Sequence, residues 1–365
     1  MPRTTRRSFL RSAVALTLLS AAGCGATPAA TPTQTSTPAT PAPSPTTATA
    51  PATAAPTMMK QQPAPSAVAQ APSATAVAPA APTNTPAGQS TPAPTGGQAY
   101  LAVAHGSSPE AITRAAIAAL GGIERFVKPG NDVIIKPNIC SASHTFEYAA
   151  TTNPEVVATI VTLCREAGAK RVRVMDSPFE GTDGQAYVTS GIEDAVKKAG
   201  GEMERMARMK YQESVIAQGK DLKKWSVYQD VLSADVLINV PIAKNHSIAR
   251  LTLGMKNLMG VVLDRSQIHY NLGQRLADLT SLLKPQLTVI DAVRIMTQGG
   301  PTGGSLSYVK KMDTIIASHD IVAADAYGTT LFGMKADDLD YIKAGAAMGL
   351  GQKDISNLKI ERINL

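Results

Sequence analysis

The sequence predicts an α/β domain with a mostly parallel sheet and helices on both faces, preceded by a long N-terminal stalk. Beyond residue 98, short apolar runs alternate with amphipathic runs of helical period, as in successive β–α–β units. The apolar runs lack polar alternation, which is expected of strands that are covered on both faces. The preceding residues differ in composition, so a single folded domain is expected at residues 99–365.

Residues 1–24 have the pattern of a twin-arginine signal peptide. Arg6 and Arg7 precede an apolar run, residues 13–22, that is too short to span a membrane as a mature helix. The run leads into Ala21-Ala22-Gly23-Cys24, which is similar to a lipoprotein cleavage site except that Ala21 replaces the usual leucine. We therefore expect export by the twin-arginine route and lipidation of Cys24, which would hold the protein at the outer face of the cytoplasmic membrane or in the cell envelope. Ordinary signal peptidase cleavage is the alternative.

Residues 25–98 are almost wholly Ala, Thr, Pro, Ser, Gly and Gln, so we expect a disordered linker.

The formal net charge of the whole chain is +7. Four arginines of that total lie in the signal peptide and Lys60 lies in the linker, whereas no Asp or Glu precedes Glu110. The domain itself therefore has a net charge of only +2, which gives no support to nucleic-acid binding.

The first half of the domain is expected to alternate strands and helices. Ser108 and Pro109 are typical of a helix N-terminus, as are Asn153 and Pro154, and Gly168 is a typical helix end. The expected strands are residues 99–104, 132–137 and 171–175, and the expected helices are residues 109–120, 154–167 and 190–199.

The second half continues with less regular spacing. Pro241 should interrupt an apolar strand, and Asp291 should end another. Strands are expected at residues 225–228, 236–240, 287–290, 314–317 and 358–363, and helices at residues 272–283 and 321–332.

A cluster of polar residues follows the strand at residues 236–240. Lys244 and His246 come first, and a helix-like run then adds Thr252, Lys256 and Asn257. Thr252 and Lys256 are four residues apart, so on a helix they would share a face. Because ligands of open α/β sheets bind beyond the carboxyl ends of the strands, this stretch indicates a site for an anion.

Other polar residues lie at predicted strand ends and are expected at the same site. Lys136 and Asn138 end one strand, and Asp176 and Asp291 end two others. The alternatives are a Lys136 side chain that extends to solvent and an Asp176 that caps a turn. The loop at residues 298–304 could bind an anion through the backbone amides of Gly299 and Gly300, although such loops are usually mobile turns.

These residues suggest a division of roles. The ligand would be a small carboxylate or phosphate, bound by the lysines and by the amides of the site; the ligand-binding residues would be Lys136, Asn138, Lys244, Asn257, Gly299 and Gly300. His246 is the natural general acid or base, with Lys256 as its catalytic partner, although a plain hydrogen-bonding role for His246 stays open. Asp176 and Asp291 could hold a divalent cation such as Mg²⁺.

The chain resembles the domain of unknown function 362 (DUF 362) family over nearly all of residues 100–365. The resemblance is carried by Ile135-Lys136-Pro137-Asn138, Asp176-Ser177-Pro178, Lys244-Asn245-His246, Lys256-Asn257-Leu258-Met259-Gly260, Asp291, Gly299-Gly300-Pro301, and Ala317-Ser318-His319-Asp320 with Asp325. It implies an α/β fold and no settled function.

Some members of that family carry ferredoxin-like cysteine motifs and are described as iron–sulfur proteins. With Cys24 lipidated, only Cys140 and Cys164 remain here, without Cys-x-x-Cys spacing, so an iron–sulfur cluster is not expected. Cys164 falls on an apolar helix face and is expected in the core, and a disulfide between the two stays open.

Two hypotheses of function follow. The first is an exported, membrane-tethered enzyme that acts on a small anion, assisted by a metal ion. The second is a tethered protein that binds such an anion without chemistry. The sequence does not identify protein partners.

Overall fold

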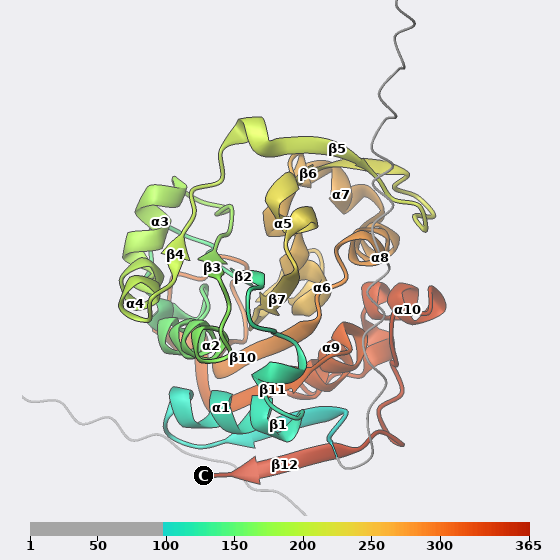
Figure 1. Ribbon diagram of the computed structural model, residues 1–365. Coiled ribbons are helices and arrows are strands. Elements are labelled where there is room, and N and C mark those ends of the chain that lie inside the picture. Colours follow the sequence, from blue (N-terminus) through green and yellow to red (C-terminus); the bar gives the residue numbers. More distant parts are fainter. Residues whose placement is uncertain (1–97) are drawn as a thin grey trace, which may run out of the picture. The chain divides into compact units, whose positions relative to one another are not determined.

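The computed structural model describes residues 98–365 (Figure 1). The expected signal peptide, lipidation site Cys24 and linker at residues 25–98 fall almost entirely outside the described residues. Each helix within the described part of the chain is too short or too polar to cross a lipid bilayer.

A ten-stranded mixed sheet forms the centre of the domain. Its main path runs β12-β1-β11-β10-β7-β2-β3-β4, and only β11 opposes the direction of the other strands on this path. The strands of this path are β1 (Leu101–His105), β2 (Asp132–Pro137), β3 (Arg171–Val174), β4 (Glu202–Met203), β7 (Val236–Val240), β10 (Leu287–Met296), β11 (Val309–Ser318) and β12 (Ile360–Asn364). The expected fold class, a mostly parallel sheet with helices on both faces, is confirmed.

Helices cover both faces of this sheet and pack their apolar side chains on it. One face carries α1 (Pro109–Ala119), α2 (Pro154–Glu166), α3 (Asp183–Thr189) and α4 (Ile192–Lys198). The other carries α5 (Gln229–Ser233), α6 (Gly254–Asn257), α7 (Arg265–Ile268), α8 (Leu272–Leu283), α9 (Ile321–Thr330) and α10 (Asp340–Ala347). In Figure 1, α3 and α4 lie at the left of the domain, and α8 and α10 lie at its right.

The predicted N-caps are confirmed. The side chain of Ser108 accepts from the backbone N–H of Ala111, and that of Asn153 accepts from Glu155. The strand expected at residues 225–228 is β6 (Lys224–Tyr228), which pairs with β5 (Tyr211–Val215) in a separate two-stranded antiparallel sheet. Strand β5 and several helices, α3 and α10 among them, were not predicted.

The polar stretch after Pro241 differs most from expectation. It forms a hairpin of two short strands, β8 (Ile242–His246) and β9 (Arg250–Thr252), whose turn places Arg250 at a positive φ of 63°. Thr252 therefore ends a strand, and the expectation that it shares a helix face with Lys256 is wrong.

The reason is the length of β10, which continues past Asp291 to Met296. Near its start β10 pairs with β7, and further along it pairs with β8. Asp291, expected at a strand end, thus lies within a strand. Because β8 continues along β10 beyond the end of β7, polar residues of β8 stand above the carboxyl ends of β7 and β2.

Candidate functional site

A cavity of about 550 Å³ lies at the carboxyl ends of β2 and β3, beside β8, β9 and α6. We call it the basic pocket. Seven of the expected site residues line it, namely Lys136, Asn138, Asp176, Lys244, His246, Lys256 and Asn257. Residues far apart in the sequence thus meet at one edge of the sheet, as parallel strands predict.

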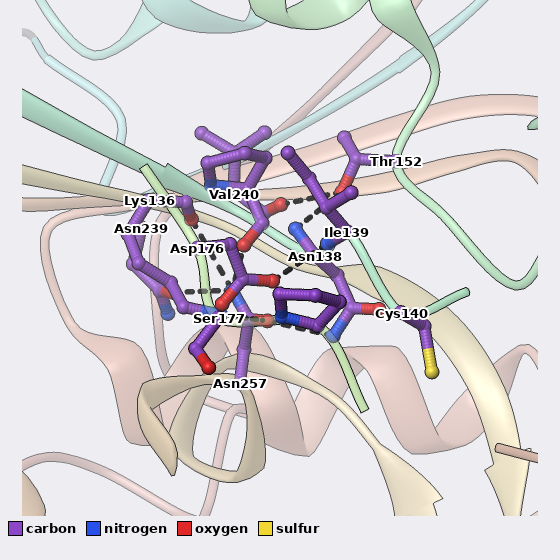
Figure 2. Close-up of polar contacts among 12 residues, drawn as sticks. Lys136, Asn138, Ile139, Cys140, Thr152, Asp176, Ser177, Asn239, Val240 and Asn257 are labelled. Carbon is purple, nitrogen blue, oxygen red and sulfur yellow. Dashed lines mark hydrogen bonds and ion pairs between the residues drawn. The ribbon is translucent and has the colours of Figure 1, made fainter. Parts of the chain in front are cut away.

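Lys136 ends β2 and is buried against a carboxylate. Its Nζ lies 2.9 Å from Oδ1 of Asp176 and donates to Oδ1 of Asn257 at 2.7 Å (Figure 2). The second carboxylate oxygen of Asp176 accepts from the backbone N–H of Ile139 at 2.6 Å. Burial lowers the pKa of Lys136, and the nearby Asp176 opposes that shift. Lys136 is therefore a charge-compensated lysine in the floor of the pocket.

Gly260 allows this ion pair to be covered closely. A Cβ at that position would come within 1.8 Å of Asp176 Oδ1 and 2.6 Å of Lys136 Nζ. A larger residue would force the pair apart. The glycine that ends the motif Lys256-Asn257-Leu258-Met259-Gly260 thus has a steric reason.

The side-chain amide of Asn257 connects the ends of β2 and β7, and its hydrogen bonds are made to protein groups. Its Oδ1 accepts from Lys136 and, at 2.9 Å, from Asn138 Nδ2, and its Nδ2 donates to Asn239 Oδ1 at 2.8 Å (Figure 2). The amide is buried. Its contacts fix the positions of the charged groups around it.

Lys244, on β8, is buried without a carboxylate partner. Its Nζ donates to three neutral oxygens: Asn138 Oδ1 at 3.0 Å, the Ala150 carbonyl at 2.6 Å and the Pro301 carbonyl at 2.9 Å. These acceptors use all three of its donors. Burial lowers the pKa of Lys244. Its charge contributes positive potential to the pocket, whereas its hydrogen bonds are made to the loops that contain Asn138, Ala150 and Pro301.

Lys256 differs from both. It is partly exposed at the pocket wall, and it forms no hydrogen bond or ion pair with any residue of the described chain. Burial, followed by the charge of Lys244, lowers the pKa of Lys256 from 10.5 to about 7. Near neutrality a substantial fraction of this side chain is therefore an uncharged amine.

The position of Lys256 depends on a residue outside the pocket. Asp325, buried in α9, accepts from the backbone N–H groups of Gly254 at 2.6 Å and Met255 at 2.9 Å, the first two residues of α6. A Cβ on Gly254 would lie 2.7 Å from Asp325 Oδ1, which explains the glycine. Burial raises the pKa of Asp325 to about 7.

The hydrogen bonds of His246 define its tautomer. Its Nδ1 accepts from the backbone N–H groups of Ile248 and Ala249, both at 3.1 Å, so the proton of the neutral ring lies on Nε2. Burial, followed by the charges of Lys256 and Lys244, lowers the pKa of His246 to about 3. Near neutrality His246 is thus a fixed hydrogen-bond donor.

Two further basic residues line the pocket that sequence reasoning passed over. Arg265, on α7, donates to the carbonyls of Ser177 at 2.9 Å and Pro178 at 2.8 Å. His269 has its Nδ1 3.0 Å from the carbonyl of Arg265, which places the proton on Nδ1 and leaves Nε2 as an acceptor. Their spacing of four residues on a short helical run was the signal that could have found them.

The other expected site residues lie elsewhere. Gly299 and Gly300 do not line the pocket, and the amide of Gly300 donates instead to Asn245 Oδ1 at 3.2 Å. Their loop contributes the carbonyl of Pro301, which Lys244 binds.

Asp291 also lies outside the pocket lining, and its two oxygens accept from the backbone N–H groups of Asn153 at 2.7 Å and Val293 at 2.9 Å. Asp176 is occupied by Lys136 and Ile139. Within residues 98–365, no group of three or more His, Cys, Asp or Glu side chains is arranged to hold a metal ion. A shared Mg²⁺ site of Asp176 and Asp291 does not fit this arrangement.

The two cysteines of the domain are free and buried. Cys164 lies on the buried face of α2, where burial raises the pKa of its thiol to about 12. Cys140 lines the basic pocket, with its Sγ 3.5 Å from the carbonyl of Pro301.

Comparisons with known proteins found one similar sequence and two similar structures among others. The thylakoid-associated protein sll1697 of Synechocystis sp. is 26% identical over 249 residues, which cover 66% of this chain and 75% of that protein. The lactate racemase apoprotein of Thermoanaerobacterium thermosaccharolyticum is similar in structure with a TM-score of 0.37 at 12% identity, over 63% of this chain and 56% of that chain. A protein from Thermotoga maritima has a TM-score of 0.32 at 10% identity, over 62% and 60%.

The chain thus spans less than two thirds of these two solved structures. The family described as "Domain of unknown function (DUF362)" matches residues 133–330, more than half of the chain, and this match includes the strands and loops that form the pocket. The protein belongs to the DUF362 family.

Proposed function

We propose that the protein is an enzyme that binds a small carboxylate or phosphate in the basic pocket and exchanges a proton with it through Lys256. The observation that supports this most is the contrast among the three lysines. Lys136 has a carboxylate partner and Lys244 has three acceptors, whereas Lys256 has no partner among the described residues and a pKa of about 7. A group with a pKa near the working pH transfers protons most effectively.

The other residues would bind and orient the ligand. Lys244 and Arg265 have no carboxylate partner, so they supply positive potential that an anion can neutralise. His246 would donate its Nε2–H to an oxygen of the ligand, because its Nδ1 is held by backbone N–H groups. His269 would present Nε2 as an acceptor. In this proposal His246 orients the ligand, and Lys256 takes a proton from it and returns it.

Binding of sulfate and acetate to the full-length chain tests the pocket, because neither anion changes its charge between about pH 6 and pH 9. We expect Lys256→Met to weaken binding by roughly tenfold at about pH 6, where Lys256 is charged, and to have little effect at about pH 9. Lys170→Met, which removes an exposed lysine outside the pocket, is the control. Equal weakening at both pH values would contradict the assigned pKa.

Proton transfer has its own test. A panel of small carboxylic acids is incubated with the protein in D2O, and deuterium uptake at the carbon next to the carboxylate is followed by NMR. We expect uptake in at least one acid with the native chain and loss of uptake with Lys256→Met. Binding without exchange in any acid would favour the second hypothesis, a binding protein without chemistry.

We also propose that the domain is exported by the twin-arginine route and tethered to a membrane through Cys24. The signal-like residues 1–24 support this, as does the name of the thylakoid-associated relative. Labelling with a radioactive fatty acid should mark the native chain and not Cys24→Ser. A double substitution of Arg6 and Arg7 by lysine should leave the chain in the cytoplasm.

A further inference from the structure

The residues that line the basic pocket are basic at its floor and apolar towards its opening. The floor holds the buried Lys136 and Lys244. Two buried apolar side chains, Ile139 and Met259, line the wall, and Phe179 and Ile248 also line the pocket although they are 69% and 60% exposed. Residues that line a cavity and are largely exposed lie at its opening.

Large exposed hydrophobic side chains need an explanation when they gather at a functional site. Tyr270, next to the pocket residue His269, is 78% exposed as well. A small hydrophilic anion bound to the basic groups of the pocket would leave these side chains in water. An apolar group attached to the anion would cover them.

We propose that the ligand of this pocket is an amphiphile, with an anionic head group at the basic floor and an acyl or aromatic body against Phe179 and Ile248. This inference rests on the proposed function and names its substrate class. A cavity of about 550 Å³ accommodates a head group and several carbon atoms beyond it. The same chemistry is presented by a free fatty acid or alkyl phosphate and by a membrane lipid.

The consequence is a dependence of affinity on chain length. Each methylene group that is fully removed from water strengthens binding by up to about fourfold, and a methylene on a partly exposed surface contributes less. In a pocket that recognised the charge alone, acetate and octanoate would bind equally well.

The experiment measures the affinity of the full-length chain for acetate, butyrate, hexanoate and octanoate, all below the concentration at which they form micelles. We expect a rise of roughly tenfold or more from acetate to octanoate. In the double variant with Phe179→Ser and Ile248→Ser, acetate should bind as before and the rise should be lost.

The matched control is Val188→Ser with Leu306→Ser, which removes two side chains that are 67% and 57% exposed but lie outside the pocket. It should keep the native chain-length dependence. A native chain without such dependence, or a double variant that retains it, would overturn the amphiphile while leaving the proposed function intact. Failure of every carboxylate and of sulfate to bind would reject the proposed function itself.

The two sources of ligand are separated with vesicles of phosphatidylglycerol, using chain whose signal peptide has been removed. Flotation with the vesicles that requires Phe179 and Ile248, together with the chain-length dependence, identifies a lipid head group. Chain-length dependence without flotation identifies a soluble amphiphile. Flotation that survives the double variant, without chain-length dependence, contradicts the proposal.

Discussion

Two groups of cationic side chains in the same domain have opposite charge balance. The Arg173 cluster consists of Arg173 and Lys210 with three carboxylates. Arg173 lies 2.7 Å from Asp132 and 3.0 Å from Glu204, and Lys210 lies 2.7 Å from Glu204. The third carboxylate, from Asp230, contacts both cations. In the basic pocket, Lys136 has one carboxylate partner, whereas the other cations have none that they contact.

The difference separates a structural cluster from a functional one. Burial of a cation costs free energy that paired carboxylates offset, so a fully paired cluster contributes to folding and has no capacity left for a ligand. The unpaired cations of the pocket retain that capacity, and an anionic ligand would supply the missing charge. Charge balance, rather than the number of basic residues, distinguishes the two.

The sharpest test of the pairing is Lys136→Met, which leaves Asp176 buried without its cation. The exposed fractions of the two side chains are 1% and 4%, so water does not replace the lost partner. We expect a loss of about 3–5 kcal/mol in the free energy of unfolding, measured with urea. Addition of Asp176→Asn should recover most of it, because a neutral amide can still accept from Ile139. An unchanged urea midpoint in Lys136→Met would show that the ion pair is not structural.

In the Arg173 cluster, Arg173→Met should lower the free energy of unfolding by about 2 kcal/mol. The effect is smaller than for Lys136 because Asp132 is 35% exposed and water solvates it after the loss. Arg171→Met is the control, since Arg171 and Glu202 are 45% and 54% exposed and their pair contributes about 0–1 kcal/mol. Sulfate affinity should not change in either variant. Weaker sulfate binding in Arg173→Met would break the distinction between the two clusters.

The smallest expected effect is that of Lys256→Met on stability. Because the pKa of Lys256 falls from 10.5 in the unfolded chain to about 7 in the folded one, the unfolded state binds more protons between these values. The lysine therefore costs stability at low pH, and the cost decreases as pH rises from about 7 towards 10.5. With a discount for its partial exposure, the variant should be more stable by about 1 kcal/mol near pH 6 and should match the native chain near pH 10.

Urea unfolding at several pH values measures this difference, and Lys170→Met should show none. If the Lys256→Met protein were less stable than the native chain near pH 6, Lys256 would have a structural role.

Much of the fold was predictable because local signals and tertiary structure agree. Strand β2 was predicted at its observed bounds, and the capping residues Ser108 and Asn153 identified the starts of α1 and α2. The family resemblance is confirmed by the match to residues 133–330. Hairpin β8–β9 could not be predicted, because its polar residues resemble a loop and its pairing depends on the distant strand β10.

The candidate site was predictable in position but not in its contacts. Parallel strands bring Lys136 and Lys244 to one edge of the sheet, which the sequence order implies. The sequence does not show that Lys136 has a carboxylate partner and Lys256 has none, since both depend on side-chain geometry. Nor does it show that His246 Nδ1 is held by two backbone N–H groups, which defines that histidine as a donor.

The carboxylate of Asp325 has a consequence for how mutational data on this protein would be interpreted. It anchors the start of the short helix that carries Lys256, yet it lies in the apolar core and does not line the pocket. A mutational scan that measures ligand affinity would therefore show a loss at Asp325 as large as the loss at a residue that contacts the ligand. Its substitution would displace the amine instead of removing it, so raising the ligand concentration would restore occupancy without restoring turnover.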